Sequence, residues 1–477
     1  MKPYSLQEFI ARHTASGALG TAATALVVVL ATGAVVHAEK LTVNPGESIQ
    51  ATVAKAKPGD TIRVLPGTYK ETVFIDKDDI HLQGVVAEGK WPVLDGESKL
   101  NDGILASGHG TVIERMWVKH FKGNGIMTQG ANNYRIVHNV VEGPTFYAIF
   151  PQFGRNGLVA YNIITKSDDA AIYVGMSDGV DVLYNETSDS IIGIETENSL
   201  NTLIEGNYVH DNVMGIAATN LPGLPIKRAE NLIIRNNFVV RNNTKNFAPP
   251  GAITAGAPAG VGILVLGTDA TIVENNLIRD NKSTGVLIAE TTLFVTTPDA
   301  KLDPFPDRTQ ILRNTYVNNG YDPQDAVKGV LEVAGLEKGV DVLSSGKGRD
   351  NCVAERESFT SLGIKKFADC APGATSAATL TMRPPEPVES PKYTREQMGR
   401  MTYLAVCTGC HTYDSKLVGP PMIAIKALYA NNVKGMADWI AQPTRKRPEY
   451  PEMPPQNYLS EDVRTAVANY ILTELEH

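Results

Sequence analysis

The residues best suited to carry chemistry lie near the carboxyl end of the chain, in the run Cys407-Thr408-Gly409-Cys410-His411. Two thiols three positions apart, with a histidine directly after them, form the spacing that attaches a c-type haem. Each thiol can add to one vinyl group of the porphyrin, and the adjacent imidazole can bind the iron. A zinc site would need two further Cys or His ligands at suitable spacing, and a thioredoxin-like pair would end a strand where this pattern is helical. The motif therefore predicts one covalently bound haem.

Around this motif, residues 393–477 predict a small helical domain. Apolar residues recur at helical spacing from Asp462 to Leu475, and Ser460 stands ahead of them as a helix-capping residue. Gly399 precedes the haem motif at the place where a first helix would cross the last helix at Tyr470. On these features the region resembles a class I cytochrome c domain.

The resemblance implies roles for three further residues. The carbonyl of Pro420, in Gly419-Pro420-Pro421, would accept the Nδ1 proton of His411 and so orient the iron ligand. Met453, in a Met-Pro-Pro turn, would be the second axial ligand of the iron. A thioether is a soft, neutral donor, and Met/His ligation raises the reduction potential of haem iron.

Other residues of this region have weaker assignments. Met422 and Met436 are interpreted as core residues, because methionine is a common filler of apolar interiors. Trp439 and the basic run Arg445-Lys446-Arg447 could touch the haem edge or its propionates. A run of charges is more often a solvated face, so both interpretations stay open.

The middle of the chain is an internal repeat. Each unit reads Gly-Ile or a near variant, then a turn, then a short β-type run that ends in asparagine. The period is 22 or 23 residues where no insertion intervenes. Such a period, with β-branched triplets in place of helical spacing, predicts the stacked coils of a parallel β-solenoid. We expect the side chain of each asparagine to bond to the backbone or to the next asparagine along the stack. The recurring residues are Asn139, Asn162, Asn185, Asn207, Asn237, Asn276 and Asn314.

These features give residues 41–345 a resemblance to the right-handed parallel β-helix proteins, the pectate-lyase-like superfamily that includes many carbohydrate-active enzymes. An amphipathic helix over 48–57 would cap the open end of the solenoid. The predicted fold is therefore multidomain. An all-β right-handed parallel β-helix over 39–370 is followed by a Pro-rich linker over 371–392 and a small all-α cytochrome c domain over 393–477.

Insertions interrupt the repeat at 217–230, 243–260 and 291–309. They are rich in Pro, Gly or Ala, so we expect loops that project from the coils. Long loops often build a binding surface, and a groove for a partner or substrate is predicted there.

Acidic residues follow several of the repeated asparagines, so successive coils should bring some of them together. A calcium site or the acid and base of a glycan-processing enzyme could be built from such a column. Asp is also an ordinary turn residue, and no motif fixes a lyase arginine, so no catalytic residue is assigned. A Gly-rich nucleotide loop is absent from the sequence. The candidates are Asp168-Asp169, Asp189, His210-Asp211 and Arg279-Asp280.

Composition and the amino-terminal segment bear on compartment and partners. The chain has 477 residues, 43% of them apolar, and a net charge of −8, which argues against nucleic acid or anionic membrane as a partner. Residues 1–38 are interpreted as a secretory signal, because Lys2 and Arg12 precede an apolar run from 18 to 36. An uncleaved membrane anchor is the alternative. Export agrees with the haem motif, since bacterial c-type haem is attached outside the inner membrane.

Two cysteines are left outside the haem motif. Cys352 and Cys370 close a loop of intermediate length, and an exported protein meets an oxidising environment. We predict a structural disulfide between them that stabilises the fold by roughly 3 kcal/mol.

Together these features predict a periplasmic, mono-haem c-type cytochrome that carries one electron. Its β-helix would serve as a scaffold or as a docking site for a glycan or for a redox partner such as another c-type cytochrome. The alternative is a β-helix enzyme acting on acidic polysaccharide (a lyase, epimerase or hydrolase) with an attached cytochrome. A third class is a metal-handling or maturation protein, similar to the periplasmic β-helix involved in copper enzyme assembly.

Overall fold

The computed structural model describes residues 38–248, 252–295, 299–378, 393–445 and 447–476. Residues from Ala38 onward form one compact unit. The predicted secretory signal lies outside the described residues except for its last position. Within the described part of the chain, no helix is both long and apolar enough to cross a membrane.

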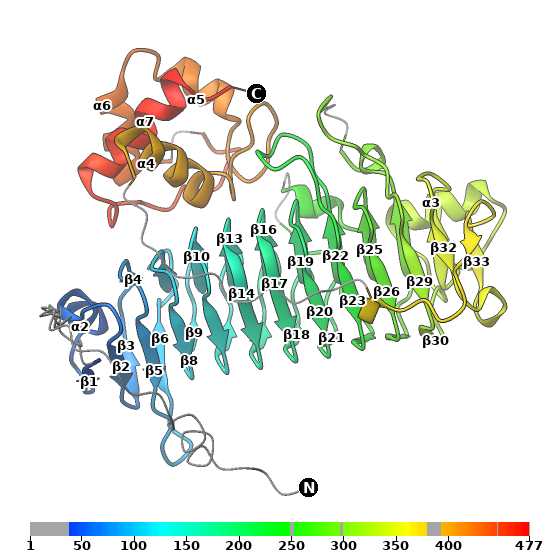
Figure 1. The fold of residues 1–477 in the computed structure, drawn as a ribbon, viewed down its shortest axis with the longest axis horizontal. Coiled ribbons are helices and arrows are strands. Elements are labelled where there is room, and N and C mark those ends of the chain that lie inside the picture. The colour runs from blue at the N-terminus through cyan, green and yellow to red at the C-terminus, as the bar shows by residue number, and fades with distance from the viewer. Residues whose placement is uncertain (1–37, 249–251, 296–298, 379–392, 446, 477) are drawn as a thin grey trace, which may run out of the picture. The chain divides into compact units, whose positions relative to one another are not determined.

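Most of the chain forms a parallel β-helix, as the repeat predicts (Figure 1). Each coil adds one strand to each of three parallel sheets, which we call A, B and C. Sheet A consists of β1 (Lys40–Val43), β2 (Thr61–Val64), β5 (His81–Gly84), β8 (Val112–Glu114), β11 (Arg135–Val137), β14 (Arg155–Ala160), β17 (Asp178–Leu183), β20 (Leu203–Glu205), β23 (Ile233–Arg235), β26 (Ile272–Glu274), β29 (Gln310–Leu312), β32 (Cys352–Val353) and β34 (Ala368–Asp369).

Sheet B is the shortest in number of strands. It consists of β3 (Gly67–Tyr69), β6 (Pro92–Asp95), β9 (Trp117–Lys119), β12 (Val140–Glu142), β15 (Ile163–Thr165), β18 (Glu186–Ser188), β21 (Tyr208–His210), β24 (Phe238–Val240), β27 (Leu277–Arg279) and β30 (Thr315–Val317).

Sheet C carries the candidate site. It consists of β4 (Val73–Ile75), β7 (Ile104–Ala106), β10 (Ile126–Gln129), β13 (Ile149–Gln152), β16 (Ala170–Gly175), β19 (Ile192–Glu197), β22 (Met214–Thr219), β25 (Val261–Leu266), β28 (Thr284–Ala289), β31 (Val342–Ser344) and β33 (Ser361–Leu362).

The apolar residue of each Gly-Ile unit fills the interior of the β-helix. Because side chains alternate along a strand, every second residue of sheet C points inward. Neighbouring strands are in register, so these isoleucines stack on one another and are fully buried. Full burial of each such side chain contributes about 1.5–3 kcal/mol, which one coil alone could not obtain. The stack includes Ile126, Ile149, Ile172, Ile194, Ile216 and Ile263.

The predicted asparagine ladder is confirmed. The backbone and side-chain amides of Asn139 both donate to Asn162 Oδ1, at 2.9 and 3.1 Å, and the pattern continues to Asn314. A second, unpredicted ladder runs from Asn212 through Asn242 and Asn281 to Asn319. Both satisfy turn groups that the strands leave unpaired.

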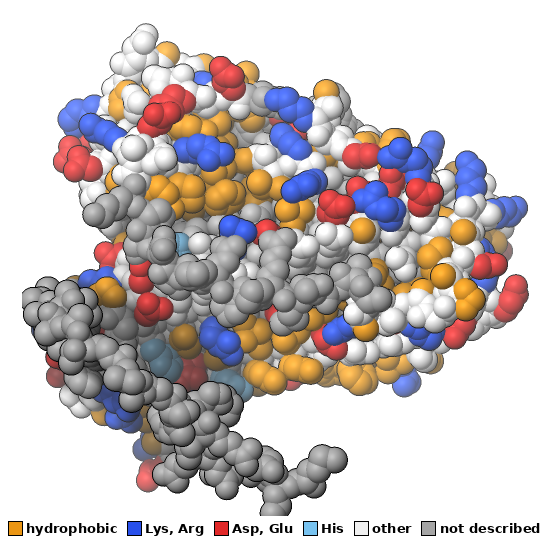
Figure 2. All heavy atoms as spheres, in the orientation of Figure 1, with side chains coloured by type: hydrophobic (Ala, Val, Ile, Leu, Met, Phe, Trp, Pro, Cys, Tyr) orange, Lys and Arg blue, Asp and Glu red, His pale blue; other side chains and the backbone are white. Residues whose placement is uncertain are grey.

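A stack of exposed rings follows the turn between sheets A and B. His138 and Tyr161 stack with centroids 4.9 Å apart, and Tyr161 and Tyr184 with centroids 5.3 Å apart. Tyr208 and Phe238 are exposed nearby on sheet B. Figure 2 shows hydrophobic side chains gathered along this edge of the β-helix, where Figure 1 labels β18 and β21.

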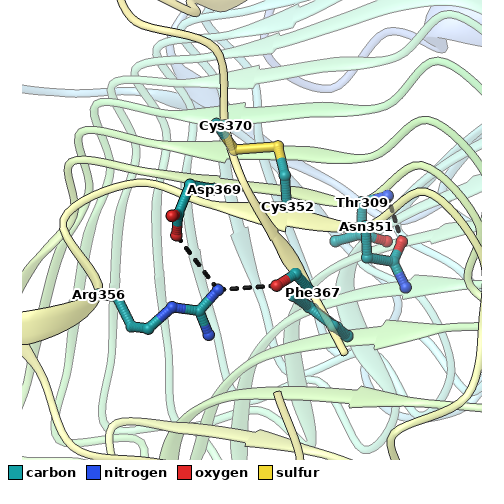
Figure 3. Close-up of a disulfide and its surroundings, with 7 residues drawn as sticks. All are labelled: Thr309, Asn351, Cys352, Arg356, Phe367, Asp369 and Cys370. Atoms are coloured by element: carbon teal, nitrogen blue, oxygen red, sulfur yellow. Dashed lines mark hydrogen bonds and ion pairs between the residues drawn. A yellow bond between two sulfur atoms is a disulfide. The ribbon is translucent and has the colours of Figure 1, made fainter. Parts of the chain in front are cut away.

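The two ends of the β-helix are closed differently. Helix α2 (Ile49–Lys55) caps the first coils with buried Ile49 and Val53, as expected, and the Ser48 side chain caps its amino terminus. At the other end, the predicted disulfide joins Cys352 of β32 to Cys370, directly after β34 (Figure 3). Arg356 supports the same turn by donating to the Phe367 carbonyl at 2.8 Å.

Of the three predicted insertions, the one at 217–230 lies wholly within the described residues. Residues 217–219 still belong to β22, and the loop after them reaches the helical segment, where the Gly223 carbonyl accepts from the Tyr413 amide; Leu221 and Leu224 are buried in a cluster that includes outward side chains of sheet C and Leu417. Short 3-10 turns, η1 (Ile253–Gly256) and η2 (Thr291–Leu293), occur in the other two, which are described only in part. The leucines of the first loop are buried because removal of their apolar surface from water lowers the free energy of the folded state.

The predicted linker is also corrected in its first part. Ser376, in η4 (Ser376–Ala378), is buried, and its backbone amide donates to Glu274 on sheet A. Ala374 and Ser376 therefore contact the β-helix. Residues 379–392 lie outside the described part of the chain.

The remaining helices are α3 (Asp325–Val333), which packs on the last coils, and four in the carboxyl-terminal segment: α4 (Arg395–Thr402), α5 (Met422–Leu428), α6 (Val433–Ala441) and α7 (Glu461–Thr473). Ser460 caps α7, as predicted. The expected crossing is present: a Cβ on Gly399 would lie 2.4 Å from the Ala466 carbonyl oxygen, so only glycine allows this approach. Met422 and Met436 are buried in the helical core.

Candidate functional site

A cavity of about 210 Å³ lies between the helical segment and the outward face of sheet C. Cys407, Cys410, His411, Pro420 and Met453 all line it. The β-helix supplies further lining from the coils of β10 and β13, and Trp439, Arg445 and Arg447 also border the cavity. The structure therefore brings together residues that the sequence separates by more than forty positions.

The motif is positioned by a change of helical geometry. Helix α4 passes into a π-helical turn over Tyr403–Cys407, the kind of irregularity that is frequent at functional sites. The backbone amides of Cys410 and His411 then donate to the Cys407 carbonyl at 3.2 and 3.0 Å. This tight turn directs both thiols and the imidazole into one cavity.

The imidazole of His411 is held in one orientation. Its Nδ1 donates a hydrogen bond to the Pro420 carbonyl oxygen at 2.7 Å. In the neutral ring, the lone pair of Nε2 is then available to bind a metal. A Cβ on Gly419 would lie 2.3 Å from His411 Cε1, so glycine is required beside the ring. Burial lowers the pKa of His411, which favours the neutral form that binds metals.

The two motif cysteines are free thiols. Burial raises the pKa of Cys407 to about 12 and that of Cys410 to about 12, so both are protonated at neutral pH. Both side chains are partly exposed and line the cavity beside the oriented imidazole, which is the arrangement that covalent attachment of a haem requires.

The β-helix holds the motif in place. Gln152 Nε2 donates to Thr408 Oγ1 at 2.9 Å and to the Leu404 carbonyl at 3.3 Å. A Cβ on Gly409 would lie 2.6 Å from the Phe150 ring, so the turn packs closely on β13. These β-helix residues were not predicted, because the sequence does not show which coil meets the helical segment.

A second contact lies one coil earlier. Gln129 Nε2 donates to the Tyr458 hydroxyl at 2.7 Å, and the Tyr458 ring lies 4.7 Å from that of Phe74. The segment that carries Met453 is thereby joined to sheet C.

Three buried acids lie on or next to sheet C. Glu195 and Glu197 are on the outward face of β19, and Asp169 directly precedes β16; each is less than a tenth exposed. The Tyr173 hydroxyl donates to Glu197 Oε1 at 2.6 Å, and the Tyr147 ring stacks on Tyr173 at 4.3 Å. Burial raises the pKa of Asp169 to about 7 and that of Glu197 to about 7. The signal for Glu195 was available, because the coils on either side place Tyr173 and Ala217 at the same position of the strand. Glu197 was less conspicuous, because its neighbours in register are Gly175 and Thr219.

The other acidic candidates lie elsewhere. Asp189, Asp211 and Asp280 occupy left-handed turn positions with φ of 53, 55 and 56°, which Asp tolerates well. Arg241 pairs with Asp211 at 3.1 Å, and Arg279 with Asp280 at 2.8 Å. Asp211 and Asp280 thus form ion pairs at the surface, and all three are turn residues.

His210 and Asp168 are the remaining candidates among the residues that follow the repeated asparagines. His210 lies 2.8 Å from Asp211 and 3.2 Å from Glu186, and Asp168 is exposed although its neighbour Asp169 is buried. Among the described residues, no group of three or more His, Cys, Asp or Glu side chains is placed to hold a metal ion. The predicted calcium column is therefore not found in this part of the chain.

Comparison with known families gives one match. Residues 94–253 match the model of the family described as periplasmic copper-binding protein (NosD). This range spans the coils that line the cavity and carry the buried acids, and it covers about a third of the chain. No curated protein sequence is significantly similar to the chain.

Several solved structures are similar in fold. An alginate lyase from Paenibacillus sp. shares 14% identity with a TM-score of 0.42, over 60% of this chain and 99% of its own. DFA-IIIase from Arthrobacter chlorophenolicus without its lid shares 12% identity with a TM-score of 0.45, over 68% of this chain and 89% of its own. The A-module of a mannuronan C-5 epimerase from Azotobacter vinelandii shares 13% identity with a TM-score of 0.36, over 60% and 86%. The chain has a parallel β-helix, and residues 94–253 of it are similar to the NosD family.

Proposed function

We propose that this protein is an exported one-electron carrier with a single c-type haem in the cavity beside sheet C. The observation that carries the proposal is the shared cavity, in which Cys407, Cys410, His411 and Met453 meet. Cys407 and Cys410 would form the two thioether bonds, and His411 and Met453 would bind the iron. The haem supplies a one-electron Fe(III)/Fe(II) couple.

The surroundings of these residues support the same assignment. Pro420 accepts the His411 Nδ1 proton, which fixes the tautomer that a metal-binding imidazole needs. Arg445 and Arg447 border the cavity and can pair with haem propionates, since guanidinium groups bind carboxylates well. Arg447 also lies over the Tyr450 ring, 5.0 Å from its centroid, so its position is defined.

Export and a redox partner belong to the proposal. The disulfide at the end of the β-helix is typical of proteins outside the reducing cytosol, and the sequence of residues 1–38 has the pattern of a secretory signal. The electron donor or acceptor would be another redox protein, such as a c-type cytochrome.

Haem staining and a pyridine haemochrome spectrum of the mature exported protein test the proposal directly. We expect one covalent haem per chain, which is lost from a Cys407→Ala, Cys410→Ala double variant. The matched control is Cys352→Ser, Cys370→Ser, which removes the other two cysteines and should keep the haem. Colourless protein from a host that attaches c-type haem contradicts the proposal.

A carbohydrate-active enzyme is the second candidate. The observation that favours it is the raised pKa of the buried carboxyl groups Asp169 and Glu197, because a carboxyl group with raised pKa can serve as a general acid in glycan chemistry. Incubation with uronate polymers, followed by detection of shortened or unsaturated products, tests this candidate. Products that disappear in Glu197→Gln would favour it over the electron carrier.

Copper handling is the third candidate, and the NosD family match over residues 94–253 supports it. Copper analysis of purified protein, with and without added chelator, tests it. One copper ion per chain that remains bound after dialysis would favour this candidate.

A further inference from the structure

Two buried glutamines are neighbours on the outward face of sheet C. Gln129 is the last residue of β10 and Gln152 is the last residue of β13, and the two are paired in register. Their side chains are 6% and 0% exposed. Strands of consecutive coils lie about 4.8 Å apart, so the two amides reach the helical segment at adjacent points.

The two glutamines contact different parts of the proposed iron site. Gln152 donates to the Thr408 hydroxyl, inside the motif that carries the iron-binding histidine. Gln129 donates to the Tyr458 hydroxyl at 2.7 Å, in the segment that carries Met453. A buried amide that loses its partner is costly, so both contacts resist opening. The β-helix is therefore bonded to the histidine side and to the methionine side of the cavity.

A chain of hydrogen bonds continues from Gln129 to the turn that carries Met453. The Tyr458 hydroxyl accepts from Gln129 Nε2 and donates to Gln456 Oε1 at 2.6 Å. Its single proton favours this contact over the longer one of 3.0 Å to Gln129 Oε1. Gln456 Nε2 then donates to the Pro454 carbonyl oxygen at 2.9 Å. Since Pro454 directly follows Met453, the chain ends beside the residue that carries the sulfur.

Two further contacts hold the same turn, which has no regular secondary structure. The Gln456 amide donates to the Ile440 carbonyl at 2.9 Å. Glu452 lies 3.8 Å from Lys122 of the β-helix, but the two side chains are 57% and 41% exposed, so this ion pair adds little. In a segment without regular structure, buried side-chain bonds decide how readily the chain opens locally.

We infer that Gln129 is a positioning residue for Met453, so that the β-helix fixes the turn that presents the sulfur to the iron. The inference rests on the proposed haem. Gln129 acts through Tyr458 and Gln456 and needs no bond to the iron. Gln152 has the corresponding role for the haem motif. Two residues of neighbouring coils thus set the separation of the two axial ligands.

The test is competition for the sixth position of the iron in the full-length, haem-loaded protein. Imidazole is the probe, because it binds there only when Met453 is displaced, so that its affinity measures how firmly the methionine is held. Gln129→Leu and Tyr458→Phe each break the chain with little change of volume. We expect imidazole to bind about tenfold more tightly to both variants, equivalent to about 1.4 kcal/mol, as the loss of one hydrogen bond implies.

Two controls separate positioning from a general loss of stability. Gln83→Leu makes the same change at a glutamine of sheet A that bonds Glu114 and does not line the cavity, and it should leave the imidazole affinity unchanged. In a Met453→Ala background, Gln129→Leu should have no further effect, because the residue that it positions is absent.

Hydrogen exchange of the full-length protein gives a second readout that does not depend on the iron. The amides of Gln456 and Leu459 donate to the carbonyls of Ile440 and Gln456 at 2.9 and 3.2 Å. Both amides should exchange about tenfold faster in Gln129→Leu, because local opening of the turn becomes easier. They should exchange at the parent rate in Gln83→Leu.

The outcomes separate the two proposals. Absence of a haemochrome in the parent overturns the haem and this inference together. A bound haem whose imidazole affinity is the same in the parent, Gln129→Leu and Tyr458→Phe overturns only the inference. An equal gain in Gln83→Leu, or a gain that persists without Met453, also overturns it, because the effect would then not pass through the turn.

Discussion

The side chain of Gln152, on the β-helix, donates a hydrogen bond of 2.9 Å to the hydroxyl of Thr408, the residue that follows the first cysteine of the haem motif. Both residues are fully buried. The β-helix therefore takes part in shaping the cavity, and its role is larger than that of a tethered scaffold.

Gln152→Ala should loosen the motif. The change removes the bonds to Thr408 and to the Leu404 carbonyl, and we expect a loss of about 1–3 kcal/mol in the free energy of unfolding measured in urea. Amides 404–408 should also exchange hydrogen faster. Gln83→Ala is the control, because Gln83 bonds Glu114 on the half-buried face of sheet A. Equal losses in the two variants would contradict a special role for Gln152.

Gly419→Ala should displace the imidazole of His411. The added Cβ would lie 2.3 Å from Cε1, so the ring must move and its 2.7 Å bond to Pro420 is weakened. We expect a lower melting temperature, equivalent to about 1–3 kcal/mol, and an altered His411 signal in NMR spectra. Gly329→Ala provides the contrast: nothing lies within 4 Å of the added atom in α3, and that variant should be neutral or slightly stabilised.

Met453→Ala should change the iron ligation of the loaded protein. Loss of the thioether lowers the reduction potential, and the Met-to-iron band at the red end of the oxidised spectrum should disappear. Met398→Ala, in α4 and away from the cavity, should leave the spectrum unchanged. An unchanged spectrum in Met453→Ala would place the sixth ligand elsewhere.

Asn185→Ala should destabilise the β-helix strongly. Asn185 accepts from both amides of Asn162 and donates to Asn207 and to the Val159 carbonyl, all within the buried ladder. We expect a loss of about 3–5 kcal/mol, because several buried groups lose their partners at once. The exposed Asn44→Ala should cost far less, and a small loss in Asn185→Ala would show that the ladder is dispensable.

Stability should depend on pH through Asp169. Burial raises the pKa of this carboxyl from its ordinary value of 3.8 to about 7, so the folded chain keeps a proton that the unfolded chain releases. The stabilisation is complete at acidic pH, falls as the pH rises from about 4 through about 7, and is constant above. Asp169→Asn should therefore gain stability relative to the parent as the pH rises from about 5 to about 8. Urea titrations of the two proteins across this range measure the difference, and parallel pH profiles would contradict the prediction.

Much of the fold was accessible from the sequence. The spacing of Gly-Ile units and asparagines predicted the coils, and Ser48 and Ser460 marked two helix starts, because each of these signals acts within one or two turns of chain. The disulfide followed from cysteine number and compartment.

The candidate site was accessible only in part. The motif and Met453 could be identified because their spacing is local, whereas Gln152, Phe150 and Asp102 border the site through contacts between distant parts of the chain. The loop containing Leu221 was expected to project, but the burial of its leucines was not expected, because it depends on side chains of other coils and of the helical segment. Such partners are set by tertiary packing, which no local pattern records.

The helical segment is fastened to the solenoid at points several coils apart. Tyr458 bonds Gln129 on β10, whereas the Tyr413 amide donates at 3.1 Å to the Gly223 carbonyl, in the loop that follows β22. The coils between these two contacts set the distance between them. Duplication or deletion of one coil there would preserve the hydrogen-bond pattern of the asparagine ladder. It would, however, displace one of the two contacts by one strand spacing, about 4.8 Å, so that both could not form together. The number of coils between these two contacts is therefore fixed, although the repeat could gain or lose coils elsewhere.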